Sequence, residues 1–572
     1  MEKEVIDFKD IKGIIYNSVE KYGDNVAFTI KEKIDKNIKY TDVLYKEMIE
    51  DINNFGTGLY EKGYKDIRIA IMGKNRYEWV LTYLTNLMGG IVSVPLDKDL
   101  KYDELENSLI RSKAECIVFD TKLKDTMLEI RKNGKTFLKH YICMDSGIED
   151  FESVQDIINI GKEARDKGNN EYVNAEIDEN KMSVLLFTSG TTAQSKAVML
   201  SSRNIASNIY AMRCVQGIKS TDVNIAFLPF HHIFGSTCVL MMLACGVKTV
   251  FPDGLKYIKQ NLKEYKVTLF VGVPALVDAM YKSVMKEIEK QGKTKLIKVA
   301  TKVSNALLKC KIDIRRKLFK QVIDGLGGEL RMIIEGGAAA DPIISKSFNS
   351  FGILVVQGYG LTETSPVIVA ENPNNLRIGS VGKPMLNDIV EIDNKDEEGV
   401  GEIKVKGPNV MLGYYEMPEE TERVLKDGYF YTGDLGYIDK DGYVFITGRS
   451  KNMIVLKNGK KIFPEELELL VNRLDLVEES MVFGLPDDED KTDLKLAVKV
   501  VYDEENVKQK HGEKTEQEIY DIIWNEIKEL NKSFPTYKYI KKLILSKDEL
   551  IKNSSKKIKR FEEMKVILNE NK

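Results

Sequence analysis

A run of small hydroxyl residues, one glycine and a lysine lies between two apolar stretches near residue 190. The run, LLFTSGTTAQSKAVML from Leu185 to Leu200, contains Thr188, Ser189, Gly190, Thr191, Thr192 and Lys196. Hydroxyl groups and backbone N–H groups in a loop after a strand can surround phosphate oxygens, and a lysine can neutralise their charge. The spacing is not that of the P-loop, GxxxxGK[ST], because alanine follows the lysine. We interpret the run as an anion-binding loop, and the alternative is an ordinary surface turn rich in serine and threonine.

A second stretch carries the parts that a nucleotide site needs. It reads QGYGLTET, and its members are Gln357, Gly358, Tyr359, Gly360, Thr362 and Glu363. An aromatic ring offers a flat face to a base, glycines let a ligand approach the backbone, and a carboxylate is a suitable ligand for Mg²⁺. Shortly before it, Gly336, Gly337 and Ala338 leave the backbone uncovered after an expected strand. The alternatives are a tight strand–helix connection for the first stretch and a helix start that needs small residues for the second.

Weaker patterns occur at further places, each with a common structural explanation. They are Asp434 in YTGDLG, Arg449 with Lys451 in GRSK, Gly459 in KNGKK, Lys557 in the basic run NSSKKIKR, and His232 in LPFHHIFG. Their default interpretations are, in order, a tight β-turn, a short joint, a solvated hairpin, a solvated tail and a hydrogen-bonded core histidine. Singly these patterns predict little, and their order along the chain is more informative.

In this order and at these separations, the motifs resemble those of the adenylate-forming superfamily: acyl-CoA synthetases, peptide-synthetase adenylation domains and luciferases. The family patterns include TSGTTGxPKG, YGxTE, YxTGDxG and TxxGKIxR. The chain departs from the first pattern at Ala193, Ser195 and Ala197, where the family has glycine, proline and glycine. The resemblance covers nearly the whole chain. Residues 273–276 and the long insertion before Gly336 are most like the long-chain fatty acyl-CoA ligase branch.

The resemblance implies a role for each motif. The loop from Thr188 to Lys196 would hold the β- and γ-phosphates of ATP. Gly336, Gly337 and Ala338 would form the wall beneath adenine, Tyr359 in its turn Gln357–Gly360 would stack on the base, Thr362 would meet the α-phosphate, and Glu363 would bind Mg²⁺. Asp434 and Arg449 would bind the ribose, and Lys451 would be a hinge. Gly459 would let the pantetheine arm of coenzyme A pass. His232 would line the junction of the acyl and phosphate sites. Lys557 would enter the active site as the catalytic lysine, with Lys556 as the alternative.

The function that the resemblance implies is a fatty acid–CoA ligase that uses ATP, Mg²⁺ and coenzyme A. The enzyme would form acyl-AMP and pyrophosphate and then an acyl thioester, with Lys557, Thr362, Glu363 and His232 as its catalytic residues. Small and apolar residues after His232 favour a fatty acid of open chain length. The alternatives are an adenylation enzyme that loads an acyl carrier protein and a non-catalytic acyl-adenylate-binding protein.

The composition excludes several other classes of protein. The chain has 572 residues with 85 basic and 88 acidic side chains and a formal net charge of −3, so no global field would attract nucleic acid or an anionic membrane, and any anion binding falls to local clusters. Six scattered cysteines argue against a zinc site or disulfides. The N-terminus has no apolar signal core, and the apolar region Trp79–Leu96 is interrupted by polar residues and glycines. We expect a cytoplasmic protein without an integral membrane segment, with peripheral membrane contact left open.

The elements that would position these residues follow an alternating pattern. Short apolar runs at 68–72, 91–94 and 116–119 alternate with helical spacing at 41–62, 75–87 and 102–113, and the pattern resumes with a helix that Ser202 could cap. A lysine-rich stretch, 278–325, is expected to be a solvated helical excursion. After Pro373 the apolar residues alternate with polar ones between Asp/Gly turns.

We therefore predict an α/β protein. Residues 1–448 would form a large N-terminal domain with doubly wound mixed sheets and a small antiparallel β subdomain. Residues 449–572 would form a small mobile α+β C-terminal domain.

Overall fold

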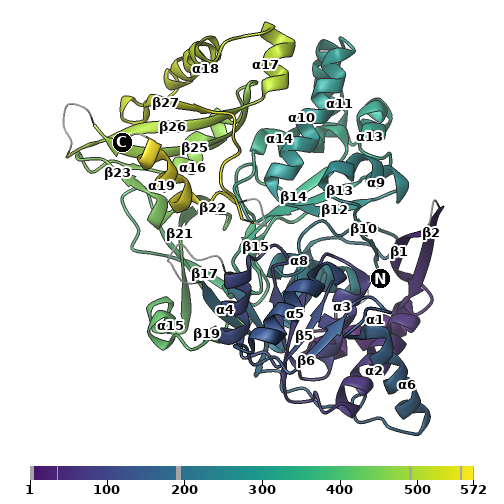
Figure 1. Ribbon diagram of the computed structural model, residues 1–572. Helices are drawn as coiled ribbons and strands as arrows, with labels where there is room; N and C mark the ends of the chain where they lie inside the picture. Colours follow the sequence, from purple (N-terminus) through teal and green to yellow (C-terminus); the bar gives the residue numbers. More distant parts are fainter. Residues whose placement is uncertain (1–4, 35–36, 189–194, 488–491, 554–556, 571–572) are drawn as a thin grey trace. The chain divides into compact units, whose positions relative to one another are not determined.

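A nine-stranded mixed sheet forms one half of the framework in the computed structural model, which describes residues 5–34, 37–188, 195–487, 492–553 and 557–570 (Figure 1). In spatial order its strands are β16 (Lys383–Pro384), β15 (Val367–Ala370), β14 (Leu354–Gly360), β13 (Met332–Gly336), β12 (Leu269–Gly272), β10 (Val223–Ile225), β11 (Lys248–Val250), β1 (Val26–Ile34) and β2 (Asn37–Leu44). The strands from β14 to β1 are parallel, and β2, β15 and β16 add antiparallel edges.

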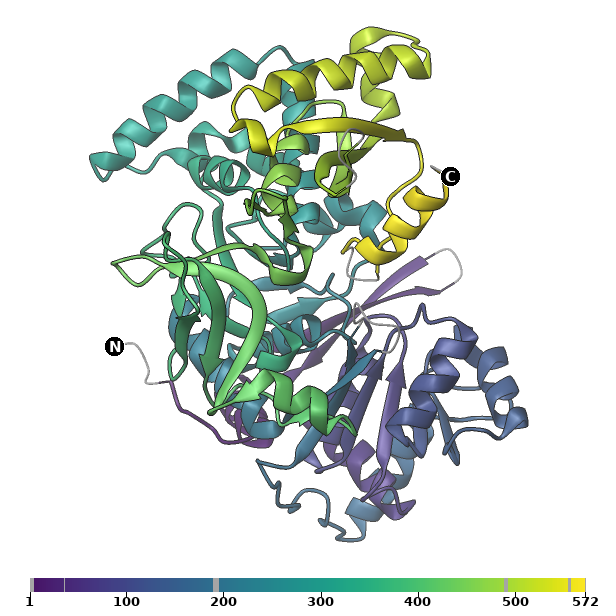
Figure 2. The same ribbon diagram turned by 90° about the vertical axis from the view of Figure 1, so that its left-hand side faces the viewer.

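Helices cover both faces of this sheet, which explains why its strands are apolar at successive positions. Phe270 packs on one side against α10 (Pro274–Lys290), α13 (Lys320–Gly325) and α14 (Pro342–Phe351), and its neighbours Leu269 and Val271 pack on the other against α8 (Ile233–Ala244). The first group of helices also includes α9 (Ile258–Glu264), α11 (Thr294–Lys309) and α12 (Arg315–Leu318). The helical excursion predicted at 278–325 is therefore confirmed as α10–α13, teal in Figures 1 and 2.

An eight-stranded sheet forms the other half of the framework. Its order is β19 (Gly413–Tyr414), β9 (Lys196–Ser201), β8 (Met182–Thr188), β4 (Val92–Leu96), β3 (Arg68–Met72), β5 (Cys116–Phe119), β6 (His140–Cys143) and β7 (Glu152–Ser153). The surrounding helices are α1 (Ile11–Tyr22), α2 (Tyr45–Glu61), α3 (Tyr77–Met88), α4 (Tyr102–Ser112), α5 (Lys124–Asn133), α6 (Val154–Asp166) and α7 (Ser202–Val215). The region from Trp79 to Leu96 is a helix followed by a buried strand, as predicted.

The structure corrects two local predictions here. The cap of α7 is Ser201 rather than Ser202: the Ser201 hydroxyl accepts a hydrogen bond of 3.1 Å from the Asn204 backbone N–H, and Ser202 is the first helical residue. The helix predicted at 41–62 begins at Tyr45, because residues 41–44 end strand β2, which pairs with β1.

A smaller antiparallel sheet follows along the chain, as the alternation after Pro373 predicts. It comprises β17 (Ile389–Asp393), β18 (Gly401–Lys406), β20 (Leu425–Lys426), β21 (Tyr429–Ile438) and β22 (Val444–Arg449), in the order β17-β18-β21-β20 with β22 paired to β21. The short helix α15 (Pro418–Val424) precedes β20.

The last part of the chain has a core of its own. The hairpin β23 (Ile454–Val455) and β24 (Lys461–Ile462) precedes the sheet β25 (Val477–Pro486), β26 (Leu494–Tyr502) and β27 (Ile540–Ser546). One face of that sheet packs on α16 (Pro464–Val471), α17 (Glu504–His511) and α18 (Glu516–Asn531), and the other on α19 (Arg560–Glu570). The predicted fold class, with mixed sheets, a small antiparallel subdomain and a C-terminal domain, is confirmed.

The chain divides into two compact units. The first comprises Met1–Val390 with Val405–Phe430, and the second comprises Glu391–Lys404 with Tyr431–Lys572. Among the residues that the structure describes, no helix combines the length and the apolar composition that crossing a membrane requires.

Candidate active site

The two ends of the predicted phosphate loop lie on adjacent strands. Thr188 is the last residue of β8 and Lys196 the first of β9, and the two residues are paired in antiparallel register. The Thr188 hydroxyl donates a hydrogen bond of 3.3 Å to the Lys196 carbonyl. The predicted phosphate-binding residues between them, Ser189, Gly190, Thr191 and Thr192, lie outside the described residues. The strands β8 and β9 therefore mark the two ends of the loop, and phosphate binding by its hydroxyl groups stays a prediction.

Lys196 contacts two side chains that the sequence did not single out. Its Nζ lies 2.8 Å from the Glu420 carboxylate in α15 and 4.5 Å from the centroid of the Tyr414 ring in β19. The Lys196 ammonium group lowers the pKa of Glu420, and burial raises the pKa of Tyr414 well above its usual range. No residue pattern marks either position, because their proximity to Lys196 arises only from the pairing of β19 with β9.

The same tyrosine connects Lys196 to the second predicted motif. The Tyr414 hydroxyl donates a hydrogen bond of 2.9 Å to Glu363 Oε1, and the Met411 backbone N–H donates one of 2.9 Å to the Glu363 carbonyl. Glu363 lies in the single 3₁₀ turn Thr362–Thr364 that follows β14. The structure thus brings a cation and a carboxylate from distant parts of the chain onto one aromatic side chain.

This arrangement suits a metal–phosphate ligand. Carboxylate oxygen is a ligand that Mg²⁺ favours, and Glu363 offers it beside a lysine that can neutralise phosphate. Within the described ranges, no three His, Cys, Asp or Glu side chains are grouped so that they could hold a metal ion. A Mg²⁺ ion bound by Glu363 would therefore take further ligands from water and from the phosphates, which is the usual situation for this ion.

The residues predicted to lie beneath adenine are at the end of β13 and directly after it, next to strand β14. Gly336 ends β13 and is in register with Gly358 on β14, and a Cβ atom at Gly336 would lie 2.9 Å from the Gly358 carbonyl oxygen. Gly337 has a φ of 85°, a left-handed conformation that favours glycine, and Ala338 is exposed. Tyr359 follows on β14 and is largely buried. Close strand packing thus explains Gly336 without a ligand, and a position for these residues beneath adenine stays a prediction.

Buried acids beside this wall were not predicted from the sequence. Glu335 is 2% exposed, its carboxylate accepts a hydrogen bond of 2.8 Å from Ser345, and burial raises its pKa to about 8. Burial also raises the pKa of Glu371 to about 7 and that of Asp278 to about 6. Glu335 precedes Gly336 directly, and Glu371 accepts a 3.0 Å hydrogen bond from the Gln357 backbone N–H. Strand sequence alone gives no signal for such a cluster.

His232 lies at the start of a buried helix near the wall. It is the N-cap residue of α8, and its ring centroid is 4.3 Å from that of His231, whose Nε2 lies 3.3 Å from Asp97. The Phe234 ring, in the first turn of α8, comes within 3.5 Å of the Cβ position that Gly336 lacks. The start of α8 and the Gly336 wall are therefore neighbours.

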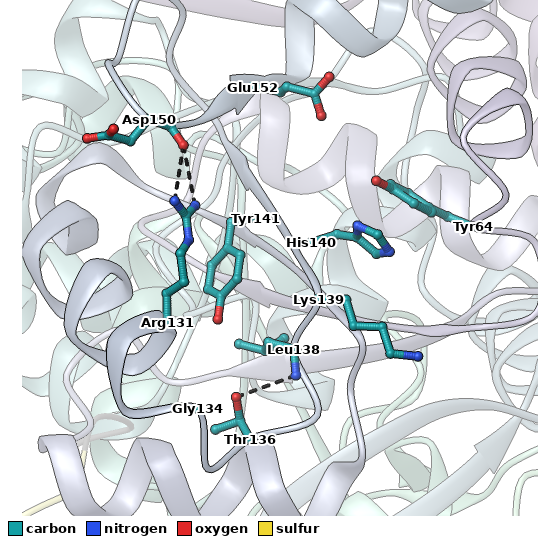
Figure 3. A pocket seen from close by; sticks show the side chains of 10 residues that line it. All are labelled: Tyr64, Arg131, Gly134, Thr136, Leu138, Lys139, His140, Tyr141, Asp150 and Glu152. Atoms are coloured by element: carbon teal, nitrogen blue, oxygen red, sulfur yellow. Dashed lines mark hydrogen bonds between the residues drawn. The ribbon is translucent and has the colours of Figure 1, made fainter.

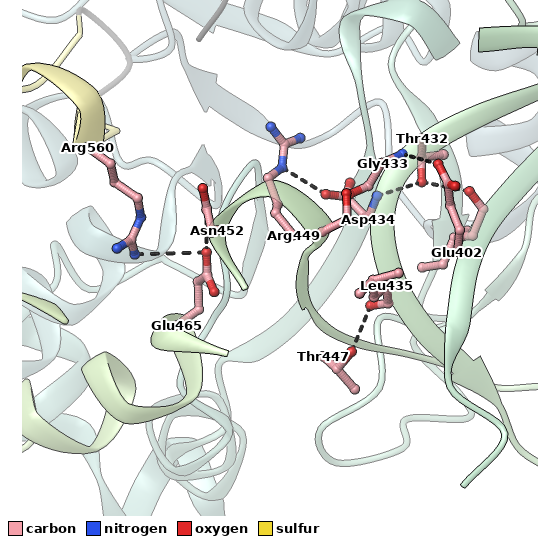
Figure 4. Close-up of polar contacts among 12 residues, drawn as sticks. Glu402, Thr432, Gly433, Asp434, Leu435, Thr447, Arg449, Asn452, Glu465 and Arg560 are labelled. Atoms are coloured by element: carbon pink, nitrogen blue, oxygen red, sulfur yellow. Dashed lines mark hydrogen bonds and ion pairs between the residues drawn. The ribbon is translucent and has the colours of Figure 1, made fainter. Parts of the chain in front are cut away.

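In the second unit, Asp434 and Arg449 form an ion pair (Figure 4). Arg449 Nε lies 2.8 Å from Asp434 Oδ1, the two residues are paired between β21 and β22, and Asp434 is 4% exposed. The predicted tight turn at Asp434 is wrong. Thr432 and Gly433 bond to Ile403 and Glu402 on one side, and β22 pairs on the other, so Asp434 lies inside strand β21.

Lys451 and Gly459 lie in short connections of the second unit. Lys451 is the middle residue of a 3₁₀ turn, Ser450–Asn452, and the Asn452 side chain donates a 2.6 Å hydrogen bond to Glu465 (Figure 4). Gly459 lies in the turn between β23 and β24 with a φ of 77°, and its backbone N–H donates to the Leu456 carbonyl at 2.8 Å. The hairpin interpretation of KNGKK is confirmed, and the glycine is required there by its dihedral angle.

Lys557 is exposed, and hydrogen bonds join the described residues on either side of 554–556. The Lys557 backbone N–H donates to Asn553 Oδ1 at 2.9 Å, the Asn553 N–H donates to the Lys557 carbonyl at 3.0 Å, and Lys552 pairs with Ile558. Asn553 stands where the family has threonine and still supplies the side-chain acceptor. Lys556, the alternative catalytic lysine, lies outside the described residues.

A separate pocket of about 300 Å³ contains none of the predicted site residues (Figure 3). Its basic groups already have partners: Lys139 pairs with Glu115 at 2.6 Å, and Arg131 donates to the Asp150 carbonyl and stacks on Tyr141. We therefore assign it no ligand. Its lining residues are Tyr64, Arg131, Gly134, Thr136, Leu138, Lys139, His140, Tyr141, Asp150 and Glu152.

Comparison with known proteins assigns the class. The model of the AMP-binding enzyme family matches residues 15–415, and that of the AMP-binding enzyme C-terminal domain matches residues 451–565. The chain therefore belongs to the AMP-binding enzyme family. The adenylate-forming resemblance drawn from the motifs is confirmed, and with it an AMP-forming ligase as the class of enzyme.

Curated relatives give the family branch. Mouse long-chain-fatty-acid–CoA ligase 5 is 30% identical over 482 residues, which cover 78% of this chain and 70% of the mouse protein. A chloroplastic long-chain-fatty-acid–[acyl-carrier-protein] ligase of Arabidopsis thaliana, AEE15, is 27% identical over 593 residues, covering 91% of this chain and 80% of the plant protein.

Solved structures share the fold over the full length. The anthranilate CoA ligase AuaEII with anthranoyl-AMP has a TM-score of 0.76 at 18% identity, and ATP-bound MatB from Rhodopseudomonas palustris has 0.73 at 22%, each covering 98% of both chains. A Mycobacterium tuberculosis fatty acyl CoA synthetase has 0.63 at 20% identity, again over 98% of both chains. At these identities the likeness shows the fold.

Proposed function

We propose that the chain is a fatty acid–CoA ligase. It would convert a fatty acid and ATP into acyl-AMP and pyrophosphate and then transfer the acyl group to coenzyme A. The observation that carries the proposal is the contact of Lys196 and Glu363 with Tyr414, in a family member whose relatives include long-chain fatty acid ligases. This contact supplies a phosphate-binding cation and a metal-binding carboxylate at one place.

The first half-reaction needs electrostatic help rather than a base. A carboxylic acid is ionised at neutral pH, so it can attack the α-phosphorus without losing a proton to the enzyme. The difficulty is to bring one anion onto a polyanion, which positioned cations overcome. Lys196 would neutralise the departing pyrophosphate, Thr362 and Lys557 would contact the α-phosphate, and Glu363 would hold Mg²⁺, which adds charge neutralisation when bound.

The second half-reaction needs a thiolate. The thiol of coenzyme A has a pKa near that of cysteine, about 8.5, so a weak base suffices to deprotonate it. We assign that help to His232, the N-cap residue of α8, because Phe234 in the first turn of the same helix packs beside Gly336. Gly459 would line the path of the pantetheine arm. The thiolate sulfur then forms a C–S bond with the acyl carbon of acyl-AMP, and the bond from that carbon to the phosphate oxygen breaks, so that AMP leaves.

The choice of a fatty acid rests on the relatives more than on the pocket. Val239 and Leu240 in α8 are buried in the core, and a helix that is apolar on all sides is explained by that burial. The apolar composition after His232 therefore no longer argues for an acyl chain. The names of the mouse and plant relatives support a long-chain acid.

A carrier protein is the second candidate acceptor. The Arabidopsis acyl-carrier-protein ligase covers 91% of this chain, a larger share than the mouse CoA ligase covers. Both acceptors present a phosphopantetheine thiol, so the same first half-reaction serves either one.

The test separates activation from transfer. ATP–pyrophosphate exchange is measured with a panel of acids from acetate to long-chain fatty acids, and we expect exchange to rise with chain length. Coenzyme A and phosphopantetheinylated acyl carrier protein are then compared as acceptors, with coenzyme A expected to react faster. Absence of exchange with every acid would instead favour a non-catalytic acyl-adenylate-binding protein.

A further inference from the structure

Helix α11 exposes two parallel stripes of side chains, one apolar and one basic. Leu296, Val299 and Val303 are 62%, 59% and 50% exposed. Lys295, Lys298 and Lys302 precede them by one position each and are exposed as well. Both sets follow the i, i+3, i+7 spacing that places residues on one face of a helix. We call these six residues the α11 surface.

The opposite face of α11 attaches the helix to its unit. Ser304 is buried, and Ile297 and Ala300 pack against the core that α10 and α14 share. That contact accounts for the apolar residues on the inner face only. The exposed aliphatic stripe has no such explanation, and contiguous exposed apolar surface commonly marks an interaction site.

The charge around the α11 surface is strongly one-sided. Residues 293–320 contain ten basic side chains and one acidic side chain, whereas the whole chain has a net charge of −3. Helix α11 has no acidic residue. None of its lysine side chains makes a hydrogen bond or an ion pair with another residue in the part of the chain that the structure describes. A local positive field therefore surrounds the aliphatic stripe.

We propose that the α11 surface docks on an anionic lipid bilayer. A helix that lies in the plane of a membrane buries an aliphatic stripe at the headgroup boundary while flanking lysines reach anionic headgroups with their ammonium groups. Charge complementarity selects this occupant over a second copy of the chain, because two α11 surfaces would bring like charges together. The inference is independent of the proposed function, since membrane binding is measured without catalysis.

The first test compares charge variants in vesicle sedimentation. The native chain should bind vesicles of phosphatidylcholine with phosphatidylglycerol and not vesicles of phosphatidylcholine alone. The variant K295E/K298E/K302E should bind at least about tenfold more weakly, because each lysine near an anionic surface contributes to binding. The matched control is K508E/K528E/K532E, the same charge change on exposed residues in α17, in α18 and directly after α18, which should keep its binding within about twofold.

A second variant tests the aliphatic stripe without changing charge. V299S/V303S should bind anionic vesicles at low salt and release them at high salt, whereas the native chain should retain a salt-resistant fraction. Salt screens the lysines but not the buried aliphatic contact. Thermal unfolding of each variant confirms that the fold is kept, since all the altered side chains are exposed.

Two native cysteines give a positional test in the otherwise unchanged chain. Cys310, at the end of α11, and Cys214, at the end of α7, are both exposed. A solvent-sensitive fluorophore on Cys310 in a C214S variant should shift to the blue with anionic vesicles, and one on Cys214 in a C310S variant should not. Equal shifts at both cysteines, absence of native binding, or equal losses in the two charge variants would overturn the proposal. Light scattering could instead show a dimer, or a complex with an acidic carrier protein, that forms with the native chain and is lost in K295E/K298E/K302E. If that variant still binds vesicles, either result would also overturn the proposal.

Discussion

At the residue scale, Tyr414 connects the two motifs on which the proposed chemistry depends. Its ring lies under the Lys196 ammonium group and its hydroxyl donates to Glu363. We expect Tyr414→Phe to raise the KM for MgATP about tenfold in the exchange assay, because a hydrogen bond to a charged acceptor contributes about 1.5–3 kcal/mol. The neighbouring Tyr415→Phe should leave the KM unchanged. If both variants behave alike, Tyr414 does not position Glu363.

Lys557 is the residue whose role differs most between the half-reactions. We expect Lys557→Ala to abolish the formation of acyl-AMP, because the carboxylate would lose the cation that screens its approach to the α-phosphate. The same variant should still convert supplied acyl-AMP to the thioester. Lys556→Ala is the matched control and should retain both activities. Equal losses of both half-reactions in Lys557→Ala would contradict this division.

Glu335 makes stability depend on pH. Its pKa is about 8 in the folded chain, above the ordinary value of 4.5, so the folded state keeps a proton that the unfolded state releases. Stability contributed by the protonated form is thus complete below about pH 4.5 and is lost as the pH rises to about 8. Glu335→Gln should remove this contribution to the pH dependence of the unfolding free energy, which is at most about 1.4 kcal/mol per pH unit. The exposed Glu329→Gln should keep it; urea unfolding from pH 5 to 8 measures both.

Sequence alone could predict chemical types at these positions but not their neighbours. Thr188, Lys196 and Glu363 were identifiable because each belongs to a motif with fixed spacing. Tyr414 and Glu420 were not, since their contact with Lys196 depends on β19 pairing with β9. The turn predicted at Asp434 failed for a related reason: glycine next to aspartate favours a turn, but strands on both sides of β21 outweigh that preference.

At the element scale, a buried ion pair anchors the segment that carries Lys557. Lys499 of β26 lies 2.6 Å from Glu563 of α19, with side chains 9% and 2% exposed, and Glu563 also accepts a 2.8 Å hydrogen bond from the Ile551 backbone. Lys499→Met would leave a buried carboxylate without its partner. We expect a loss of about 3–5 kcal/mol in unfolding free energy.

The control pair lies beside this one along the chain, because Lys559 directly precedes α19 and Glu562 directly precedes Glu563. Lys559 and Glu562 form a partly exposed pair at 3.2 Å, so Lys559→Met should cost at most about 1 kcal/mol. Chemical denaturation of the full chain measures both variants. Similar small losses would show that the Lys499–Glu563 pair does not anchor helix α19 to strand β26.

Element prediction succeeded where both periodicity and length were clear. The strands predicted at 68–72 and 116–119 have those bounds in the structure. Strand β14 instead runs through the glycines of the QGYG motif to Gly360, because β15 pairs with its last residues. Boundaries set by a partner strand are not visible in the segment's own sequence. For α11, the sequence at 278–325 predicts a helix correctly. It does not predict which face of the helix is exposed, because that depends on how α11 packs against α10 and α14.

At the scale of the whole molecule, the residues proposed for the reaction divide between two compact units. Lys196, Tyr359 and Glu363 belong to the first, and Asp434, Lys557 belong to the second. The unit boundary passes through residues 390, 404 and 430, whereas the family model of the C-terminal domain begins at residue 451. These boundaries differ, and the resemblance selects Lys451 as the hinge.

Lys451→Pro tests that joint because proline fixes φ near −65° and removes a backbone donor. Side-chain hydrogen bonds fix both neighbours of Lys451: Ser450 donates to the Gly433 carbonyl at 3.0 Å, and Asn452 donates to Glu465 at 2.6 Å. A rotation at this joint would therefore change the φ and ψ angles of residue 451 itself. We expect the variant to form acyl-AMP at nearly the native rate and to form the thioester at least about tenfold more slowly, as expected when a rotation precedes the second step. Lys451→Ala loses the same ammonium group but keeps its rotational freedom, so it should support both steps. Pre-steady-state measurement of AMP-ester and thioester formation separates the two rates, and unimpaired thioester formation in Lys451→Pro would place the joint elsewhere.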